Sequence, residues 1–182
     1  MEDLLKLIAK GDEKALKKLY EKTKNLVFSY VYQLCGDKIL AEEIMINTYV
    51  EVWKSASKFE GRSKVETWIL GIARNLTFNT FKKLSEKTEL ELNEDFPLEE
   101  DVFSKCAEKE LIFLLKEAIK KLPLKHREVL NLVFLQNLKY EEISKILNIP
   151  VNTVKTRVFF AKRKLKEILA QMGVKKEDVF GK

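Results

Sequence analysis

Apolar residues recur at the spacing of an α-helix along nearly the whole of this 182-residue chain, and this periodicity limits the possible folds more than any other feature. No stretch alternates convincingly between apolar and polar residues, as a half-buried strand would. Glycine and proline, with six and three residues, are too few for a fold built on many tight turns. The sequence therefore predicts an all-α protein without a sheet.

Local signals place the ends of several expected helices. Asp12 is a suitable N-cap for a helix that continues to Gly36, where glycine suits a left-handed C-cap. Asp37 is a suitable cap for the next helix, which is expected to run to about residue 54. Ser63, with Glu66 three residues later, has the form of a capping box that opens a further helix.

Two short helical segments near the C-terminus are joined by a tight connection. The segments are 140–147 and 151–169, and Asn148-Ile149-Pro150 lies between them. Asparagine tolerates the left-handed conformation that ends a helix, and proline is pre-set to begin one. This arrangement predicts a helix-turn-helix.

Charge divides the chain into segments. Residues 85–109 carry nine acidic and three basic side chains, and both flanking blocks have a basic excess. With its weak periodicity, this strip is expected to be an acidic linker between two small helical domains, 1–84 and 110–170, with a tail at 171–182. It is either a solvated connector, a segment that fills a basic groove on a partner, or a cover for the basic blocks.

Residues suited to catalysis or to binding a metal are scarce. His126 is the single histidine, Cys35 and Cys106 lie far apart, and no glycine-rich phosphate loop is present. We therefore expect no enzyme activity, no metal and no cofactor. No apolar run approaches the length that spans a bilayer, and the two cysteines fit a reducing compartment, so a cytoplasmic protein without membrane insertion is expected.

The last predicted helix carries the clearest indication of a ligand. Six basic side chains and no acidic one lie between Val151 and Lys166. Val154, Val158, Ala161 and Leu165 form a narrow apolar stripe that can pack inward. The side chains on the other faces are of the types that contact base edges and phosphates in a major groove: Asn152, Thr153, Lys155, Thr156, Phe159 and Arg163. The alternative is a basic surface helix with no ligand.

Two sets of motifs together resemble one protein family. The N-terminal set includes Ala41-Glu42-Glu43-Ile44, Phe59-Glu60-Gly61-Arg62-Ser63 and Thr67-Trp68-Ile69-Leu70-Gly71-Ile72-Ala73-Arg74-Asn75-Leu76. The C-terminal set includes Leu122-Pro123-Leu124-Lys125-His126-Arg127-Glu128, Tyr140-Glu141-Glu142-Ile143 and Ile149-Pro150-Val151-Asn152-Thr153-Val154-Lys155-Thr156-Arg157. In this order, with a variable linker between them, they resemble the bacterial RNA polymerase sigma factors of the sigma-70 family, extracytoplasmic-function (ECF) group. The domains 1–84 and 110–170 would then correspond to sigma regions 2 and 4.

This resemblance implies partners and contact residues. The partners are RNA polymerase core and promoter DNA, and many relatives are also held by an anti-sigma protein. The helix at about 37–54 would dock on the polymerase clamp through Glu42, Glu43, Tyr49 and Glu51. The minus-ten element would meet Phe59, Arg62, Ser63, Arg74, Asn75 and Lys82, with Asn75 at the position that reads an extruded base. The minus-thirty-five element would meet Asn152, Thr153, Lys155, Thr156, Arg157, Phe159, Phe160 and Arg163.

Some positions depart from the family pattern. Phe160 stands where many relatives carry arginine, and Gly71 stands where a basic residue is frequent. A second hypothesis, a stand-alone dimeric helix-turn-helix regulator, would use the C-terminal domain alone and leave the helix at 37–54 without a role. A protein–protein adaptor with incidental basic charge is a third.

Overall fold

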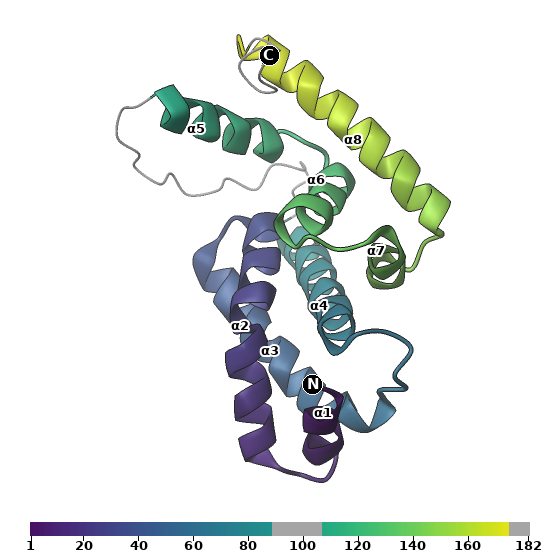
Figure 1. The fold of residues 1–182 in the computed structure, drawn as a ribbon. Coiled ribbons are helices and arrows are strands. Elements are labelled where there is room, and N and C mark those ends of the chain that lie inside the picture. The colour runs from purple at the N-terminus through teal and green to yellow at the C-terminus, as the bar shows by residue number, and fades with distance from the viewer. Residues whose placement is uncertain (89–106, 175–182) are drawn as a thin grey trace.

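A computed structural model of the protein describes residues 1–88 and 107–174 (Figure 1). These residues form eight α-helices with short 3-10 and π-helical turns, and they contain no strand. The expectation of an all-α fold is confirmed. The predicted linker lies largely outside the described residues, as does the predicted tail after Val174.

The N-terminal half contains four helices. They are α1 (Glu2–Ile8), α2 (Glu13–Cys35), α3 (Lys38–Ser55) and α4 (Val65–Thr88), with the 3-10 turn η1 (Ala56–Lys58) after α3. Helix α2 packs against α1, α3 and α4, and α3 also packs against α4. The four helices occupy the lower part of Figure 1.

The predicted caps of α2 and α3 are confirmed. Asp12 accepts a hydrogen bond from the Ala15 amide at 3.1 Å, and Asp37 accepts one from the Leu40 amide at 2.9 Å. Gly36 ends α2 with a φ of 72°, a conformation that glycine adopts without steric penalty. These contacts depend only on neighbouring residues, which is why sequence signals place them correctly.

The capping box predicted at Ser63 is wrong. Helix α4 begins two residues later, and its first turn closes where the Trp68 amide donates to the Lys64 carbonyl at 3.1 Å. The Ser63 hydroxyl instead donates to the Lys64 carbonyl at 3.2 Å, so it caps no amide of α4. Because α4 begins only at Val65, Ser63 lies one residue too early in the chain to cap its first turn.

The C-terminal half begins inside the predicted linker. Helix α5 runs from Ala107 to Lys120, and α4 continues to Thr88, so both ends of the 85–109 segment are helical. Three helices follow: α6 (Leu124–Leu130), α7 (Tyr140–Leu147) and α8 (Val151–Gln171). The π-helical turn η2 (Asn131–Leu135) follows α6 directly.

The predicted helix-turn-helix is formed by α7 and α8. Asn148 ends α7 in the left-handed conformation, with a φ of 51°, and Pro150 is the N-cap of α8. The Ser144 hydroxyl donates to the Ile149 carbonyl at 2.5 Å and holds the turn. Helix α8 packs on α5, α6 and α7.

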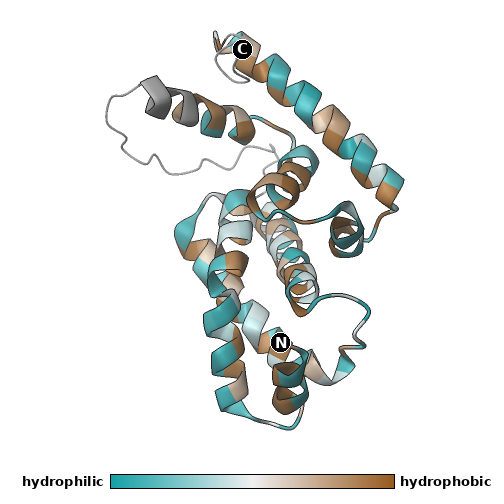
Figure 2. Ribbon diagram, viewed as in Figure 1, coloured by the Kyte–Doolittle hydropathy of each residue, from teal (hydrophilic) through white to brown (hydrophobic). Residues whose placement is uncertain are grey.

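The two halves share one continuous core. The buried apolar residues form a single cluster that includes Leu34 and Val31 of α2, Leu70 of α4 and Val129 of α6. Helices α6 and α7 lie between the N-terminal helices and α8 (Figure 1). The most apolar stretches in Figure 2 lie where helices face one another, and α8 shows an alternation of polar and apolar residues along its length.

Candidate nucleic-acid interface

Helix α8 presents a basic face to solvent. Val154, Val158 and Ala161 are at most 3% exposed and anchor the helix on its neighbours, as the apolar stripe predicts, and Leu165, the last member of the stripe, is half-buried. Among the residues expected to contact DNA, those on the exposed face are Asn152, Lys155, Thr156, Phe159, Phe160 and Arg163. Glu167 is the first acidic residue along α8, and it lies 3.3 Å from Lys164 and 3.8 Å from Arg163.

The other two α8 candidates, Thr153 and Arg157, are half-buried. They line a shallow cavity of about 240 Å³ beside α6, together with His126, Phe160, Arg163 and Lys164. Thr156 and Glu167 also line the cavity. Three of the lining side chains are cationic and one is acidic, so the hollow carries a net positive charge next to the exposed face of α8.

Two aromatic side chains stand on the surface of α8. Phe159 and Phe160 are 63% and 41% exposed, and their rings meet edge to face with centroids 5.5 Å apart. The Arg163 guanidinium lies 4.9 Å from the Phe160 ring. Exposed aromatic residues beside cations are typical of an interface.

Sequence reasoning missed an apolar extension of this surface. Phe134 and Leu135, in the π-helical turn, are 58% and 55% exposed, and the Lys162 ammonium lies 5.1 Å from the Phe134 ring. The π-helical turn rotates its last two side chains toward solvent.

A second site lies on α4, where Asn75 is exposed and Arg74 is half-buried. Both line a cavity of about 380 Å³ with Ser63 and Trp68, and its opposite wall is formed by Lys145, Ile146 and Asn148 of the helix-turn-helix. The Phe59 ring meets the edge of Trp68 at 5.4 Å. The structure thus gathers Phe59, Ser63, Arg74 and Asn75 at one place.

The remaining minus-ten candidates lie further out. Arg62 is exposed and forms an ion pair with Glu60, and its backbone carbonyl accepts a hydrogen bond from the Lys145 ammonium. Lys82 is exposed on the last turns of α4.

Arg74 is bound by a carboxylate from the other half of the molecule. Its Nε donates to Oε1 of Glu128 at 2.7 Å, and the Tyr30 hydroxyl donates to the same oxygen at 3.0 Å. Burial raises the pKa of Glu128, while the Arg74 guanidinium and the Tyr30 hydroxyl act against that shift. The pKa of Tyr30 is raised well above its usual value by burial and by the neighbouring carboxylate.

The polymerase-facing candidates on α3 divide into two groups. Glu42 and Glu43 are exposed and Glu51 is half-exposed. Tyr49, expected on this surface, is only 5% exposed, and its hydroxyl lies 2.7 Å from that of Thr23 in the core. Burial raises the pKa of Tyr49 to about 12. The surface assignment of Tyr49 is therefore corrected: a hydroxyl partner on α2, distant in the sequence, holds it inside.

Whereas Tyr49 is buried, three apolar side chains of α3 are exposed to solvent. Ile39, Ile46 and Val50 are 80%, 57% and 45% exposed, on the same helix as Glu42 and Glu43. Their spacing of seven and then four residues keeps them on one helical face. This spacing is the sequence signal that could have predicted an apolar stripe formed by Ile39, Ile46 and Val50 on α3.

The sequence matches two family descriptions. Residues 19–86 match Sigma-70 region 2, and residues 112–165 match Sigma-70, region 4. The two matches occur in the order of the two halves, and together they cover most of the chain. The chain belongs to the sigma-70 family of RNA polymerase sigma factors. Within this family it is a member of the extracytoplasmic-function (ECF) group, as its curated relatives indicate.

Two relatives come from Bacillus subtilis (strain 168). The ECF RNA polymerase sigma factor SigW is 29% identical over 182 residues, covering 92% of this chain and 96% of SigW. The ECF RNA polymerase sigma factor SigM is 28% identical over 153 residues, covering 82% of this chain and 92% of SigM. These similarities favour the sigma factor over the stand-alone regulator: the chain directs promoter-specific transcription initiation by RNA polymerase.

Solved structures share the fold. CnrH, in complex with the cytosolic domain of CnrY, matches with a TM-score of 0.70 at 18% identity and covers 93% of this chain and 97% of its own. The sigma factor RpoE from Bartonella quintana, in complex with the anti-sigma factor NepR, has a TM-score of 0.70 at 21% identity, covering 86% and 98%.

The described residues show neither a metal-binding cluster nor a membrane-spanning helix. Residues 1–88 and 107–174 hold no cluster of three or more histidine, cysteine, aspartate or glutamate side chains placed to bind a metal ion. Over the same part of the chain, no helix has the length and apolar character needed to cross a membrane.

Proposed function

We propose a division of labour among three helices: α3 binds RNA polymerase core, α4 reads the minus-ten element, and α8 reads the minus-thirty-five element. The observation that carries this proposal is the presence, in one molecule, of a basic face on α8 with no acidic residue before Glu167 and of the Asn75-bearing cavity on α4. The proposed domains are 1–84 and 110–170, with 85–109 as the linker and 171–182 as the tail.

The polymerase contact combines apolar and acidic side chains. Ile39, Ile46 and Val50 supply exposed apolar area, and Glu42, Glu43 and Glu51 supply charge. Apolar side chains surrounded by polar ones are the usual composition of a protein interface. Tyr49 supports this face from inside and does not touch the polymerase.

The minus-ten contact uses the cavity on α4. The Asn75 amide can form two hydrogen bonds to a base edge, and Trp68 with Phe59 offers aromatic surface for an unstacked base. Ser63 lies at the cavity wall, and Arg62, Arg74 and Lys82 are suited to backbone phosphates.

The minus-thirty-five contact uses α8 as a recognition helix in the major groove. Lys155, Thr156 and Phe159 face bases, with Asn152 and Thr153 at the N-terminal end of the helix, as is typical of helix-turn-helix proteins. Arg157 and Arg163 are placed for phosphate or groove contacts. Phe160 can meet a thymine methyl where an arginine would have met an acceptor.

Further properties follow from this role. A sigma factor works where RNA polymerase works, so we infer a cytoplasmic location, and we infer that the chain has no catalytic activity of its own. Because RpoE was solved in complex with the anti-sigma factor NepR, we propose that an anti-sigma protein also binds this chain.

Run-off transcription with purified RNA polymerase core tests the proposal. Transcripts from shared start motifs should appear only when the protein is added. Ile46→Glu should reduce transcription at all promoters, because a charge replaces an exposed apolar contact. Lys22→Glu, an exposed charge reversal on α2, serves as control. Normal transcription by Ile46→Glu would contradict the role of α3.

A further inference from the structure

The middle of the exposed face of α8 is apolar, although the helix as a whole is basic. Thr156 precedes Phe159 by three residues and Phe160 by four, so the three side chains are neighbours on the helix surface, and all three are exposed. Within the described residues, α8 is the one helix with two exposed phenylalanines. Exposed apolar side chains grouped in this way mark a contact with an apolar partner.

The one polar group among these three side chains is already engaged as a donor. The Thr156 hydroxyl donates its single hydrogen to the Asn152 carbonyl at 2.9 Å, so it has no hydrogen left to donate to a base. Its methyl group remains, beside two phenylalanine rings that carry no hydrogen-bonding atom. The side chains at the centre of α8 therefore offer apolar surface and no hydrogen-bond donor.

The Phe160 ring is held in place by its neighbours. The Phe159 ring meets it edge to face with centroids 5.5 Å apart, and the Arg163 guanidinium lies 4.9 Å from its centroid. Arg163 is itself restrained, because its Nε lies 3.8 Å from the Glu167 carboxylate. The apolar surface thus has a defined position before any DNA is bound, which reduces the side-chain entropy lost on binding.

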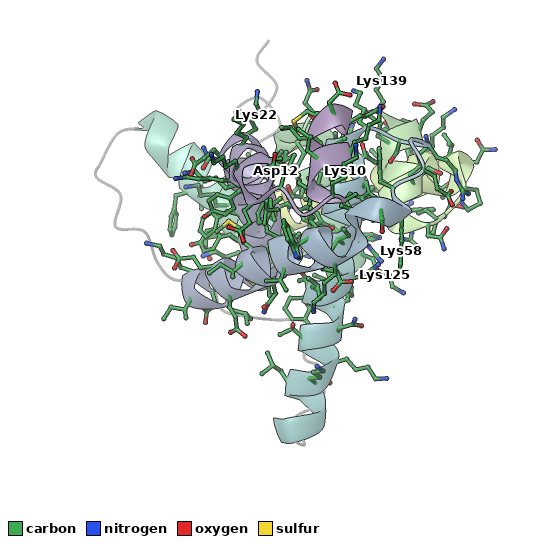
Figure 3. The ribbon with its side chains drawn as sticks, turned by 90° about the horizontal axis from the view of Figure 1, so that it is seen from below. Lys10, Asp12, Lys22, Lys58, Lys125 and Lys139 are labelled. Atoms are coloured by element: carbon green, nitrogen blue, oxygen red, sulfur yellow. The ribbon has the colours of Figure 1, made fainter. Side chains whose placement is uncertain are left out.

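Polar and cationic side chains lie on both sides of this apolar centre. Asn152 and Lys155 precede it, Lys164 follows it, and all three are exposed. Exposed lysines also project from other parts of the molecule, among them Lys22 on α2 and Lys58 on the 3-10 turn η1 (Figure 3). Positive charge attracts the phosphate backbone without selecting a base. The apolar centre is therefore the feature of α8 that can distinguish one base pair from another without a hydrogen bond.

Thymine presents the group that fits such a surface. In the major groove its C5-methyl group is apolar, whereas the other distinguishing groups on base edges are hydrogen-bond donors and acceptors. A donor or acceptor pressed against a phenylalanine ring would lose its water and gain no hydrogen bond, which is unfavourable. An apolar centre therefore favours thymine in two ways, because it attracts the methyl group and penalises polar edges at the same place.

We propose that Thr156, Phe159 and Phe160 form a methyl-reading surface, which makes promoter recognition depend on thymine methyl groups at the base pairs that face the middle of α8. This inference rests on the proposed function of α8 as the recognition helix for the minus-thirty-five element. The two rings contact the methyl groups, and Thr156 adds its own methyl group to the same surface. Arg163, held against the Phe160 ring, is a positioning residue that reaches the adjacent phosphate.

Replacement of thymine by deoxyuridine tests the proposal, because it removes the methyl group and keeps every hydrogen-bonding atom of the base pair. A promoter library randomised across the minus-thirty-five region is first transcribed by polymerase core with the full-length protein, and the selected element is sequenced. Each thymine of that element is then replaced in turn. Affinity of the polymerase complex should fall about fourfold at each methyl group in contact, which is roughly 0.8 kcal/mol converted at about 1.4 kcal/mol per tenfold. A selected element without thymine, or equal affinity for all deoxyuridine templates, would overturn the proposal.

Variants of the two phenylalanines assign the effect to α8. Phe160→Ala should bind the thymine template less tightly and should lose its sensitivity to deoxyuridine at one position, and Phe159→Ala should do so at another. Phe113→Ala removes a phenylalanine that is 44% exposed on α5 and should keep the full sensitivity. Each sensitivity is a ratio between two templates, so a change in polymerase affinity cancels. Unaltered sensitivity in both Phe159→Ala and Phe160→Ala would contradict reading by these rings.

A change of specificity gives a positive readout. Arginine recognises guanine through two acceptors in the major groove, so Phe160→Arg should replace a T·A pair by a G·C pair when the library selection is repeated. Phe113→Arg adds the same charge to α5 and should leave the selected element unchanged. An unchanged element for Phe160→Arg would mean that this side chain faces no base, and would overturn the role of Phe160.

The outcomes separate this inference from the proposed function. If Lys155→Ala and Phe160→Arg alter the selected element but deoxyuridine has no effect, α8 reads the minus-thirty-five element and the methyl-reading surface fails. If no variant of α8 alters either the element or the sensitivity to deoxyuridine, α8 is not the recognition helix, and the inference fails together with the role on which it rests.

Discussion

The hydroxyl of Tyr49 donates a hydrogen bond to the hydroxyl of Thr23 across 2.7 Å, which ties α3 to α2 inside the core. The direction follows from Thr23, whose single hydroxyl hydrogen is donated to the Leu19 carbonyl at 2.8 Å. The ring of Tyr20 meets Tyr49 edge to face at 4.8 Å. Tyr49 is therefore a structural residue beneath the proposed polymerase-binding face.

Tyr49→Phe should lower the free energy of unfolding by about 1 kcal/mol, the usual net value of one buried hydrogen bond. Transcription with saturating polymerase should remain near normal, because the exposed residues of α3 are unchanged. Urea unfolding measures the first effect and run-off transcription the second. Tyr32→Phe, on a half-buried tyrosine for which the described residues show no hydroxyl hydrogen bond, is the control. A selective loss of polymerase binding would restore Tyr49 to the interface.

Stability should fall in alkaline solution as Tyr49 is forced to ionise. Its pKa is raised from 10 to about 12 in the folded protein, so the folded state retains the phenolic proton where the unfolded state loses it. The unfolded state then binds fewer protons, and stability decreases as pH rises from about 10 toward 12. Unfolding at several pH values should show a smaller decrease in Tyr49→Phe. The pKa of Tyr30 is also raised, so Tyr30 should account for part of the loss of stability that remains in Tyr49→Phe.

Asn75→Ala should weaken promoter opening by roughly 1–3 kcal/mol if the amide reads one base through two hydrogen bonds. The penalty should be largest on the preferred base and small on its single-base variants. Abortive transcription on a panel of variant promoters measures this pattern. Asn79→Ala, one helical turn further along α4 and also exposed, is the matched control. An equal loss on every variant would indicate a contact without base selection.

Lys164 is exposed, and we infer that it contacts phosphate, so Lys164→Ala should weaken DNA binding by the same factor on all sequences. The slope of log affinity against log salt should decrease in magnitude by about one ion. Lys155→Ala should instead lower affinity most for the preferred minus-thirty-five element. The two variants are compared by titrating each, at several salt concentrations, with a duplex that contains the minus-thirty-five element and with an unrelated duplex. A sequence-dependent effect of Lys164→Ala would place that residue at the bases.

Gly71→Ala should stabilise the protein by about 1 kcal/mol, because glycine in the interior of a helix is less favourable than alanine. A Cβ added at this position meets no atom within 4 Å, so the substitution introduces no clash. Thermal unfolding measures the gain. A loss of stability would mean that α4 packs more tightly at Gly71 than the structure indicates.

The sequence alone determined the features that depend on near neighbours. The helical periodicity, the caps at Asp12 and Asp37, and the turn at Asn148 each involve residues within a few positions of one another, and all appear as predicted. The buried stripe of α8 and the partial exposure of Phe159 and Phe160 follow from the same periodicity. The match of both motif sets to one family likewise needed no coordinates.

Only the tertiary structure decided how residues distant in the chain combine. The buried Tyr49 donates its hydroxyl hydrogen bond to Thr23 on another helix. The Arg74 side chain donates a hydrogen bond to the Glu128 carboxylate from the other half of the molecule. The exposure of Ile39 and Ile46 depends on where α3 meets its neighbours. Periodicity shows which side chains share a helical face, but packing between helices decides whether that face meets solvent, the core or the other half of the molecule.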